Sequence, residues 1–353
     1  MAVSQQPGPP GGAPGGWGPR GSAPNIAYAG NRVAFPDPVR AARYPDGVWV
    51  DAAGHPVLTP YARAAAEVDA PPPGFGVDEL RVTDVVAANV ALARTGHELW
   101  RDLPLGATPH GWTWHHVAGS RRLELVPVDV KVLLRHHAGL ATSTADHGRR
   151  GTRPLQSRRP VHFELPADGQ AVGEEAVREL EEDLGIRLPG PYRTFLKAAG
   201  GRAPVGLALD PELGVLVDQP FWTVRGSQAA DDLAYANRCL REYLTRDYLA
   251  VGYVQGGLIA VRLRGTGAGS VWFCAYDDAR DHDGTTVEQR CAELLLPCGE
   301  DFDAFLRRLA GNPPELVTVA TAMVDGGFAR AVELSPPAPS GGGFGAAGDA
   351  VGR

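Results

Sequence analysis

The chain has 353 residues, of which 44% are hydrophobic and 21% charged, and its formal net charge is −7. That length suits two or three globular domains. No apolar stretch approaches the ~20 residues of a membrane span, which excludes an integral membrane protein. The first residues lack the basic and apolar segments of a signal peptide, so we expect a cytoplasmic protein. The four cysteines have no C-x-x-C spacing, which favours buried reduced thiols over zinc or disulfides.

Charge is distributed unevenly along the chain. Residues 1–160 contain 17 Lys and Arg against 13 Asp and Glu, whereas the remainder contains 17 against 28. The net charges are therefore +4 and −11. A basic region suits contacts with phosphates, and an acidic region suits a basic partner. The arginines of residues 149–159 have a second interpretation, as part of a solvated linker.

Composition also predicts the domain limits. Residues 1–25 and 335–353 are rich in Pro and Gly and have few large apolar side chains, so we expect both to be disordered. Residues 26–146 are predicted to form one domain and residues 161–334 a second. Residues 147–160, rich in Arg, Gly and Pro, are predicted to link them.

The most informative segment of the first domain lies downstream of a predicted helix over residues 82–93. Gly-Trp-Thr-Trp-His-His (residues 111–116) is typical of a strand, residues 117–122 of a turn and residues 123–126 of a second strand. A helix is predicted from about Val128, with His136 and His137 at its far end.

Neighbouring strand residues point to opposite faces, so His115 and His116 cannot share one role. Imidazole is a common metal ligand and the best base near neutral pH. One histidine can therefore ligate a metal while the other faces a substrate, as in a ββα-metal nuclease. Alternatively, the histidine pairs are solvated surface residues. Trp112 and Trp114 share one strand face and are predicted to support the hairpin rather than stack on bases.

These motifs resemble the WHH branch of the HNH/endonuclease VII nucleases, toxin modules of bacterial conflict systems. The resemblance rests on Trp-His-His (114–116), Leu-Val-Pro (125–127), His-His-Ala-Gly (136–139) and the upstream Ala-Ala-Asn ending at Asn89, and it spans residues 43–145. It implies that His116 is the general base, that His115 and His136 are metal ligands, and that Asn89 and Trp114 are structural neighbours of the site.

One residue departs from the family pattern. Lys131 stands where the family usually has a histidine, and a protonated lysine has no lone pair for a cation. Either His137 replaces it, or two histidines and water complete the site, or the site is weakened. The implied cofactor is a divalent ion: Mg, Mn, Ni or Zn. Arg121, Arg122 and Arg135 are expected to contact the nucleic-acid backbone, of DNA rather than RNA, because most relatives cut DNA.

The second domain is predicted to be α+β with an antiparallel sheet. Residues 174–184 form an amphipathic helix, and Gly185 suits the left-handed position after it. Further helices are expected over residues 192–199, 229–244 and 301–309. Short strands are expected over 206–209 and 214–217, followed by a meander of 248–253, 258–263 and 270–276.

This half resembles the SUKH superfamily of Smi/Knr-type domains, which serve bacteria as immunity proteins against toxin nucleases. The resemblance rests on Glu-x-Asp-Leu-Gly-Ile-Arg-Leu-Pro (181–189), Pro-x-x-Tyr-Arg-x-Phe-Leu (189–196), Gly200-Gly201 and the closing segment 302–309. It covers residues 170–311 and implies binding rather than catalysis. The acids of residues 174–182 are either a contact for a basic toxin or an ordinary solvated helix face.

Together, the resemblances predict a metal-dependent, toxin-like endonuclease fused to an immunity domain that binds the nuclease in cis or another toxin in trans. The opposite net charges predict a largely electrostatic contact if the binding is in cis. A rival hypothesis is a degenerate nuclease domain in a non-enzymatic immunity or toxin-binding protein. A structural metal held by the histidines, with no chemistry, is a third possibility.

Overall fold

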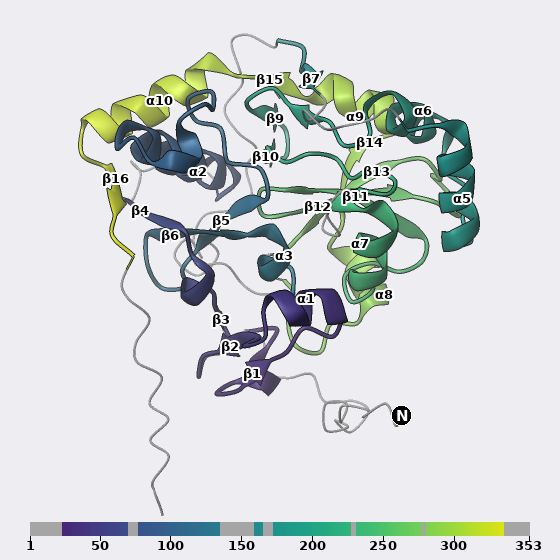
Figure 1. Cartoon of the computed structure of the whole chain (residues 1–353), viewed down its shortest axis with the longest axis horizontal. Coiled ribbons are helices and arrows are strands. Elements are labelled where there is room, and N and C mark those ends of the chain that lie inside the picture. Colours follow the sequence, from purple (N-terminus) through teal and green to yellow (C-terminus); the bar gives the residue numbers. More distant parts are fainter. Residues whose placement is uncertain are drawn as a thin grey trace, which may run out of the picture.

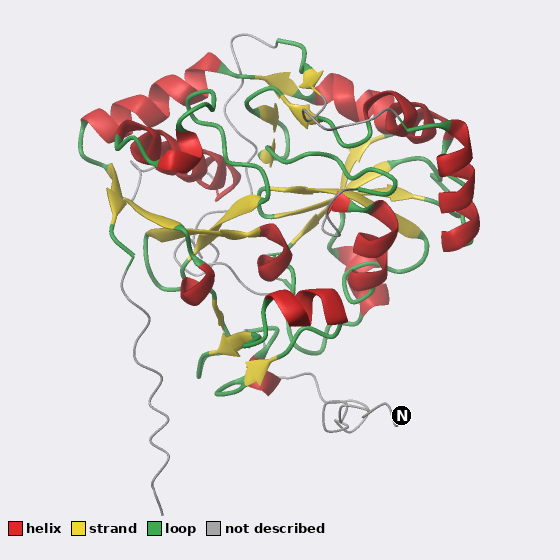
Figure 2. Cartoon of the chain, in the orientation of Figure 1, coloured by secondary structure: helices red, strands yellow, loops and turns green. Residues whose placement is uncertain are grey.

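The computed structural model describes residues 23–69, 77–134, 159–164, 172–226, 231–276, 278 and 280–334. It consists of helices and antiparallel sheets, which confirms the predicted α+β class (Figure 1, Figure 2). No helix within these ranges is long and apolar enough to cross a membrane. Arg135, His136 and His137 lie outside the described residues, as do most of the predicted tails and linker.

A small three-stranded sheet, β1-β2-β3, opens the described chain. Its elements are η1 (Ile26–Tyr28), β1 (Arg32–Val33), α1 (Pro38–Arg43), β2 (Val48–Val50), β3 (Pro56–Val57) and η2 (Thr59–Tyr61). Helix α1 begins after Asp37, whose carboxylate accepts a hydrogen bond from the backbone N–H of Arg40 at 2.9 Å. The apolar side of this unit packs against Val126 and Val130.

The sheet that carries the histidine pair has the order β16-β4-β6-β5. Its strands are β4 (Ala64–Val68), β5 (Trp112–His116), β6 (Arg122–Pro127) and β16 (Ala329–Val332). The short helix α3 (Val128–Lys131) follows β6 directly, so the predicted order of strand, strand and helix is present. Helix α2 (Val77–Arg94) lies against the sheet, and every residue from 81 to 92 is buried.

The last described segment, α10 (Pro314–Asp325) and β16, was predicted to belong to the second domain. It packs with the histidine-bearing sheet. Helix α10 lies beside α2, and β16 pairs with β4 so that Ala331 is opposite Ala66 (Figure 1). The packing of α2 between the sheet and α10 explains why residues 81–92 of this helix are all buried. The domain limits stay a prediction. Within the described residues, the segment of α10 and β16 contacts the N-terminal half.

The second half contains the predicted meander, extended to the four-stranded sheet β11-β12-β13-β14. Its main elements are α5 (Glu174–Leu184), α6 (Gly190–Ala199), α7 (Leu233–Cys239), β11 (Tyr248–Val254), β12 (Gly257–Arg262), β13 (Val271–Ala275), α8 (Val287–Glu293), β14 (Leu296–Gly299) and α9 (Phe302–Arg308). Smaller strands are β7 (Phe163–Glu164), β8 (Ala203–Pro204), β9 (Ala208–Asp210), β10 (Val215–Val217) and β15 (Ala310–Gly311). Gly185 ends α5 at φ 63°, as predicted.

Three local expectations differ from the structure. Of the helix predicted over 229–244, residues 229–230 lie outside the described residues, and α7 runs from Leu233 to Cys239 because the chain then turns to enter β11. Strand β14 was not predicted, since Pro297 has no N–H for a ladder and is tolerated only because β14 is an edge strand. Helix α8 begins with a capping box of Thr286 and Gln289, a sequence signal that the prediction missed.

The two halves share one apolar core. Leu207, Leu209 and Leu216 of the second half are each 1% exposed and belong to the same cluster as the buried residues of α2, β4 and β6. Ala320 of α10 and Ala329 of β16 complete this cluster. The histidine-bearing sheet therefore depends for its core on residues from three separate parts of the chain.

Candidate functional site

The hairpin of β5 and β6 places His115 and His116 on opposite faces of the sheet. His116 pairs with Leu123 and His115 with Glu124, and side chains alternate along each strand. The face of His116 is shared with Leu123 and Trp114 and packs on α2. The other face lies under the N-terminal unit, where Thr59 donates to the Glu124 carboxylate. Both faces are covered, and the histidines are only 5% and 4% exposed.

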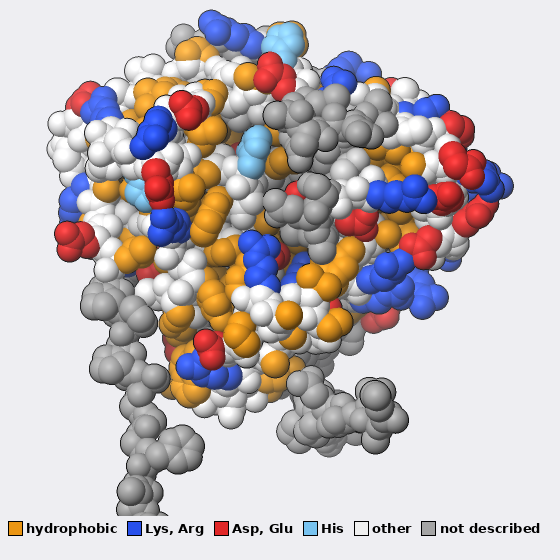
Figure 3. All heavy atoms as spheres, in the orientation of Figure 1, with side chains coloured by type: hydrophobic (Ala, Val, Ile, Leu, Met, Phe, Trp, Pro, Cys, Tyr) orange, Lys and Arg blue, Asp and Glu red, His pale blue; other side chains and the backbone are white. Residues whose placement is uncertain are grey.

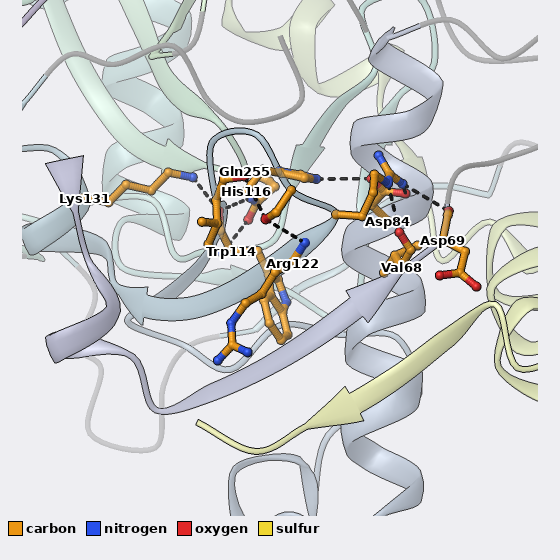
Figure 4. A network of polar contacts seen from close by, with 11 residues as sticks. Val68, Asp69, Asp84, Trp114, His116, Arg122, Lys131 and Gln255 are labelled. Atoms are coloured by element: carbon orange, nitrogen blue, oxygen red, sulfur yellow. Dashed lines mark hydrogen bonds and ion pairs between the residues drawn. The ribbon is translucent and has the colours of Figure 1, made fainter. Parts of the chain in front are cut away.

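His116 belongs to a buried ionic network with α2. Its Nε2 lies 3.3 Å from Oδ2 of Asp84, and Oδ1 of the same carboxylate accepts a hydrogen bond from Arg121 at 2.8 Å (Figure 4). Arg121 also donates to the backbone carbonyl of Val68 at 2.9 Å. Burial lowers the pKa of His116, and the charges of Lys131 and Arg121 lower it further against the opposing effect of Asp84. The imidazole is thus favoured in its neutral form.

Asn89 anchors Trp114, the middle residue of the histidine strand. Its Oδ1 accepts hydrogen bonds from the indole N–H groups of Trp114 at 2.8 Å and Trp100 at 3.2 Å. Its amide group donates to the carbonyl of Gly106 at 2.8 Å and to Thr108 at 3.0 Å. All four hydrogen bonds are buried, so Asn89 joins α2, β5 and the loop between them into one rigid unit.

Lys131 and Gln255 both bind the backbone of β5 at Trp114. The ammonium of Lys131, a residue 5% exposed, donates to the carbonyl of Trp114, and the Gln255 side-chain amide donates to the same carbonyl at 2.8 Å. The Gln255 carbonyl in turn accepts from the Trp114 N–H at 3.2 Å and from Thr113 at 3.0 Å. Figure 4 shows Lys131 reaching the strand from the side away from Asp84.

Two side chains of the C-terminal half, Asp218 and Gln219, lie near the start of β5. Gln219 accepts from the N–H of Gly111 at 2.8 Å and donates to the carbonyl of Pro109 at 3.4 Å. Its neighbour Asp218 is 3% exposed. Burial raises the pKa of Asp218 to about 7, although Thr108 and the charge of Lys131 act in the opposite direction.

Two of the three arginines predicted to contact nucleic acid are bound to carboxylates. Arg121 is held by Asp84, and Nε of Arg122 donates to Glu124 at 3.2 Å. Their side chains are 23% and 20% exposed. Arg135 lies outside the described residues, and the role assigned to each of the three stays a prediction.

The described donors do not fit a divalent metal ion. No group of three or more His, Cys, Asp and Glu side chains within the described ranges is placed to hold one. Asp84 is engaged by both Arg121 and His116, and Lys131, at the position where the resemblance implies a histidine, donates its ammonium to the carbonyl of Trp114. The predicted ligands His136 and His137 lie outside the described residues, so their roles remain predictions.

Sequence reasoning missed several residues of this network. Asp84 carried a signal, because it and Asn89 interrupt a helix that is otherwise mostly apolar between residues 82 and 92. A polar group inside a buried helix needs a partner, and here the partners are His116 and Trp114. Gln219 and Gln255 gave no local signal, since each follows an ordinary strand and contacts β5 only through the fold.

Comparison with known families gives two matches. Residues 104–146 match the model of a nuclease of the HNH/ENDO VII superfamily with conserved WHH. Residues 171–308 match the SMI1/KNR4 family (SUKH-1). No match to a curated protein was found. The two family matches fall on the segments whose motifs predicted them. The chain therefore joins a WHH-type segment of the HNH/ENDO VII nuclease superfamily to a SUKH-1 domain of the SMI1/KNR4 family.

Proposed function

We propose that this chain is a non-catalytic binding protein of the toxin–immunity class. In this proposal the WHH-type unit is a degenerate nuclease that now has a structural role, and the SUKH-1 domain binds a partner. The observation that supports it is the buried ammonium of Lys131, bound to the backbone of the histidine strand at a position where the resemblance implies a metal ligand.

Electrostatics favour this proposal. An ammonium has three donors and no lone pair, so it cannot coordinate a cation. A divalent ion about 5 Å from such a charge is repelled by about 7 kcal/mol at an effective dielectric constant of about 20. Arg121 adds a second positive charge, bound to Asp84 beside His116. Superfamily nucleases are generally metal-dependent, and the described residues disfavour a bound metal.

The position of His116 supports the same proposal. A general base must reach the proton that it removes, either directly or through one water molecule. The His116 side chain is 5% exposed, faces α2 and is bound to Asp84. Its neighbour His115 faces the N-terminal unit on the other side of the sheet. Neither imidazole has the open surface on which a nucleic-acid backbone would lie.

A metal-dependent endonuclease is the second candidate. The order of β5, β6 and α3, with adjacent histidines on opposite strand faces, favours it. This candidate assigns metal binding to His115, His136 and His137 and proton abstraction to His116. Arg121, Arg122 and Arg135 would contact the backbone, of DNA rather than RNA.

Plasmid nicking by the full chain distinguishes the two candidates. We expect no nicking above that of His116→Ala in the presence of Mg²⁺, Mn²⁺, Ni²⁺ or Zn²⁺. Losing a general base typically costs about 10²- to 10⁴-fold in rate. Metal-dependent nicking by the parent chain that disappears in His116→Ala would establish the endonuclease and end the degenerate-site proposal.

The proposed partner is a separate toxin nuclease, bound in trans. The second half already contacts its own histidine strand through Gln255 and Gln219, so the cis contact is part of the fold. The four unpaired cysteines support the predicted cytoplasmic location. Adding the full chain to a purified, active WHH-type nuclease should slow cleavage by that enzyme in proportion to the amount added. Unchanged cleavage at a tenfold excess would count against this partner.

A further inference from the structure

The SUKH-1 domain contains a pocket of about 260 Å³, remote in sequence from the histidine strand. It lies where the end of α5, the turn after α7, the start of β11 and the end of β12 meet. Six aliphatic side chains form its inner wall, and three arginines line it as well. The aliphatic residues are Leu184, Ile186, Leu240, Leu244, Leu249 and Leu263. No Asp or Glu is among the described residues that line it.

The three arginines are Arg241, Arg246 and Arg264, and all are exposed. They differ from those arginines of the acidic half that are bound to carboxylates. Ion pairs within the described ranges engage the side chains of Arg178, Arg193, Arg225, Arg238, Arg280, Arg290 and Arg308. Arg241, Arg246 and Arg264 form none with the described residues. Figure 3 shows Lys and Arg side chains gathered over the region of α7.

The wall of the pocket is fixed by hydrogen bonds. The side chain of Asn237 joins α7 to β11, donating to the carbonyl of Ala250 and accepting from its N–H, both at 2.8 Å. Arg264 donates to the carbonyl of Gly185 at 3.3 Å, which places its guanidinium beside the end of α5. The elements that carry the arginines are therefore preorganised, which lowers the entropic cost of binding.

We infer that this pocket binds a phosphate monoester carried on an apolar or aromatic body, such as a mononucleotide. Guanidinium groups bind phosphate oxygens through paired hydrogen bonds, and several of them suit a doubly charged phosphate better than a singly charged carboxylate. The aliphatic wall supplies the apolar contact. A volume of about 260 Å³ suits a ligand no larger than a mononucleotide.

Calorimetric titration of the full chain with phenyl phosphate and with AMP tests this inference. Both should bind more tightly than inorganic phosphate, adenosine or benzoate, and binding should weaken as salt is raised. Arg241→Ala and Arg246→Ala should each weaken phenyl phosphate binding by about 10-fold or more, the usual effect of losing a hydrogen bond between charged groups. Arg307→Ala is the matched control, because Arg307 is an exposed arginine on α9 that does not line the pocket.

Thermal unfolding of each variant verifies that it is folded. The substituted side chains are exposed, so the substitutions should not prevent folding. The inference would be overturned if neither phenyl phosphate nor AMP bound at millimolar concentration. It would also be overturned if adenosine bound as tightly as AMP, or if benzoate or inorganic phosphate bound as tightly as phenyl phosphate. Equal affinities of the Arg241→Ala, Arg246→Ala and Arg307→Ala variants for phenyl phosphate would overturn it as well. None of these outcomes depends on whether the chain cleaves nucleic acid or binds a toxin.

Discussion

Replacing Asp218 by Asn should stabilise the protein at alkaline pH and have little effect at acid pH. Burial raises the pKa of this carboxyl to about 7 in the folded chain, whereas an unfolded aspartate titrates near 3.9. The native state therefore binds the proton more tightly than the unfolded state does. Stability from this group is fully present below about pH 4 and is lost as the pH rises through about 7.

The magnitude follows from the difference in pKa. Three units at about 1.4 kcal/mol each give a cost of about 4 kcal/mol for the ionised Asp218 above pH 7. The pKa of about 7 already includes the attraction of the Lys131 ammonium, and the variant escapes the cost that remains. We therefore expect a gain in the free energy of unfolding of about 2 to 4 kcal/mol at pH 8.

Urea unfolding of parent and variant at pH 4.5 and pH 8 measures this effect. The difference between the two proteins isolates Asp218, because other titrating groups contribute equally to both. Asp303→Asn is the control, since that aspartate is exposed on α9. A difference that is the same at both pH values, or a variant less stable than the parent at pH 8, would refute the reasoning.

Three further predictions concern the side chains that hold β5 in place. Gln255→Leu should lower the free energy of unfolding by about 3 kcal/mol, because it removes three buried hydrogen bonds to β5, and should speed hydrogen exchange of the Trp114 amide. Asn89→Ala should cost about 3 kcal/mol in urea unfolding, because it leaves the Trp114 indole without its acceptor. Lys131→His should strengthen Zn²⁺ binding measured by calorimetry, since it replaces a buried cation with a potential ligand.

Local patterns predicted the parts of the site that local geometry controls. The alternation of strand residues placed His115 and His116 on opposite faces, and the hairpin and the start of α3 follow from the turn residues and Pro127. The helix over 174–184 and its left-handed Gly185 were equally evident, because amphipathic spacing and a terminal glycine are properties of neighbouring residues.

The contacts that decide the character of the site are not local. Asp84 reaches His116 across 32 positions, and Gln255 reaches Trp114 across 141. Strand β16 pairs in the histidine-bearing sheet, where Arg330 contacts Glu67 across more than 260 positions. Periodicity within a segment predicts which face is buried but not which distant segment covers it.

The shared core leads to a last prediction, which concerns the fragment of residues 1–160. The opposite net charges suggest two halves that separate in salt, yet they meet through amides and leucines. The fragment would lose Leu207, Leu209 and Leu216 from its core, and losing a buried leucine costs about 2 to 5 kcal/mol. The total of about 6 to 15 kcal/mol is comparable to the whole stability of a typical domain, about 5 to 15 kcal/mol. We expect the fragment to be unfolded by circular dichroism, and the full chain to unfold in one transition at 50 and 500 mM NaCl. A fragment with a dispersed NMR spectrum would show instead that the first half folds alone and that the second half is an attached partner.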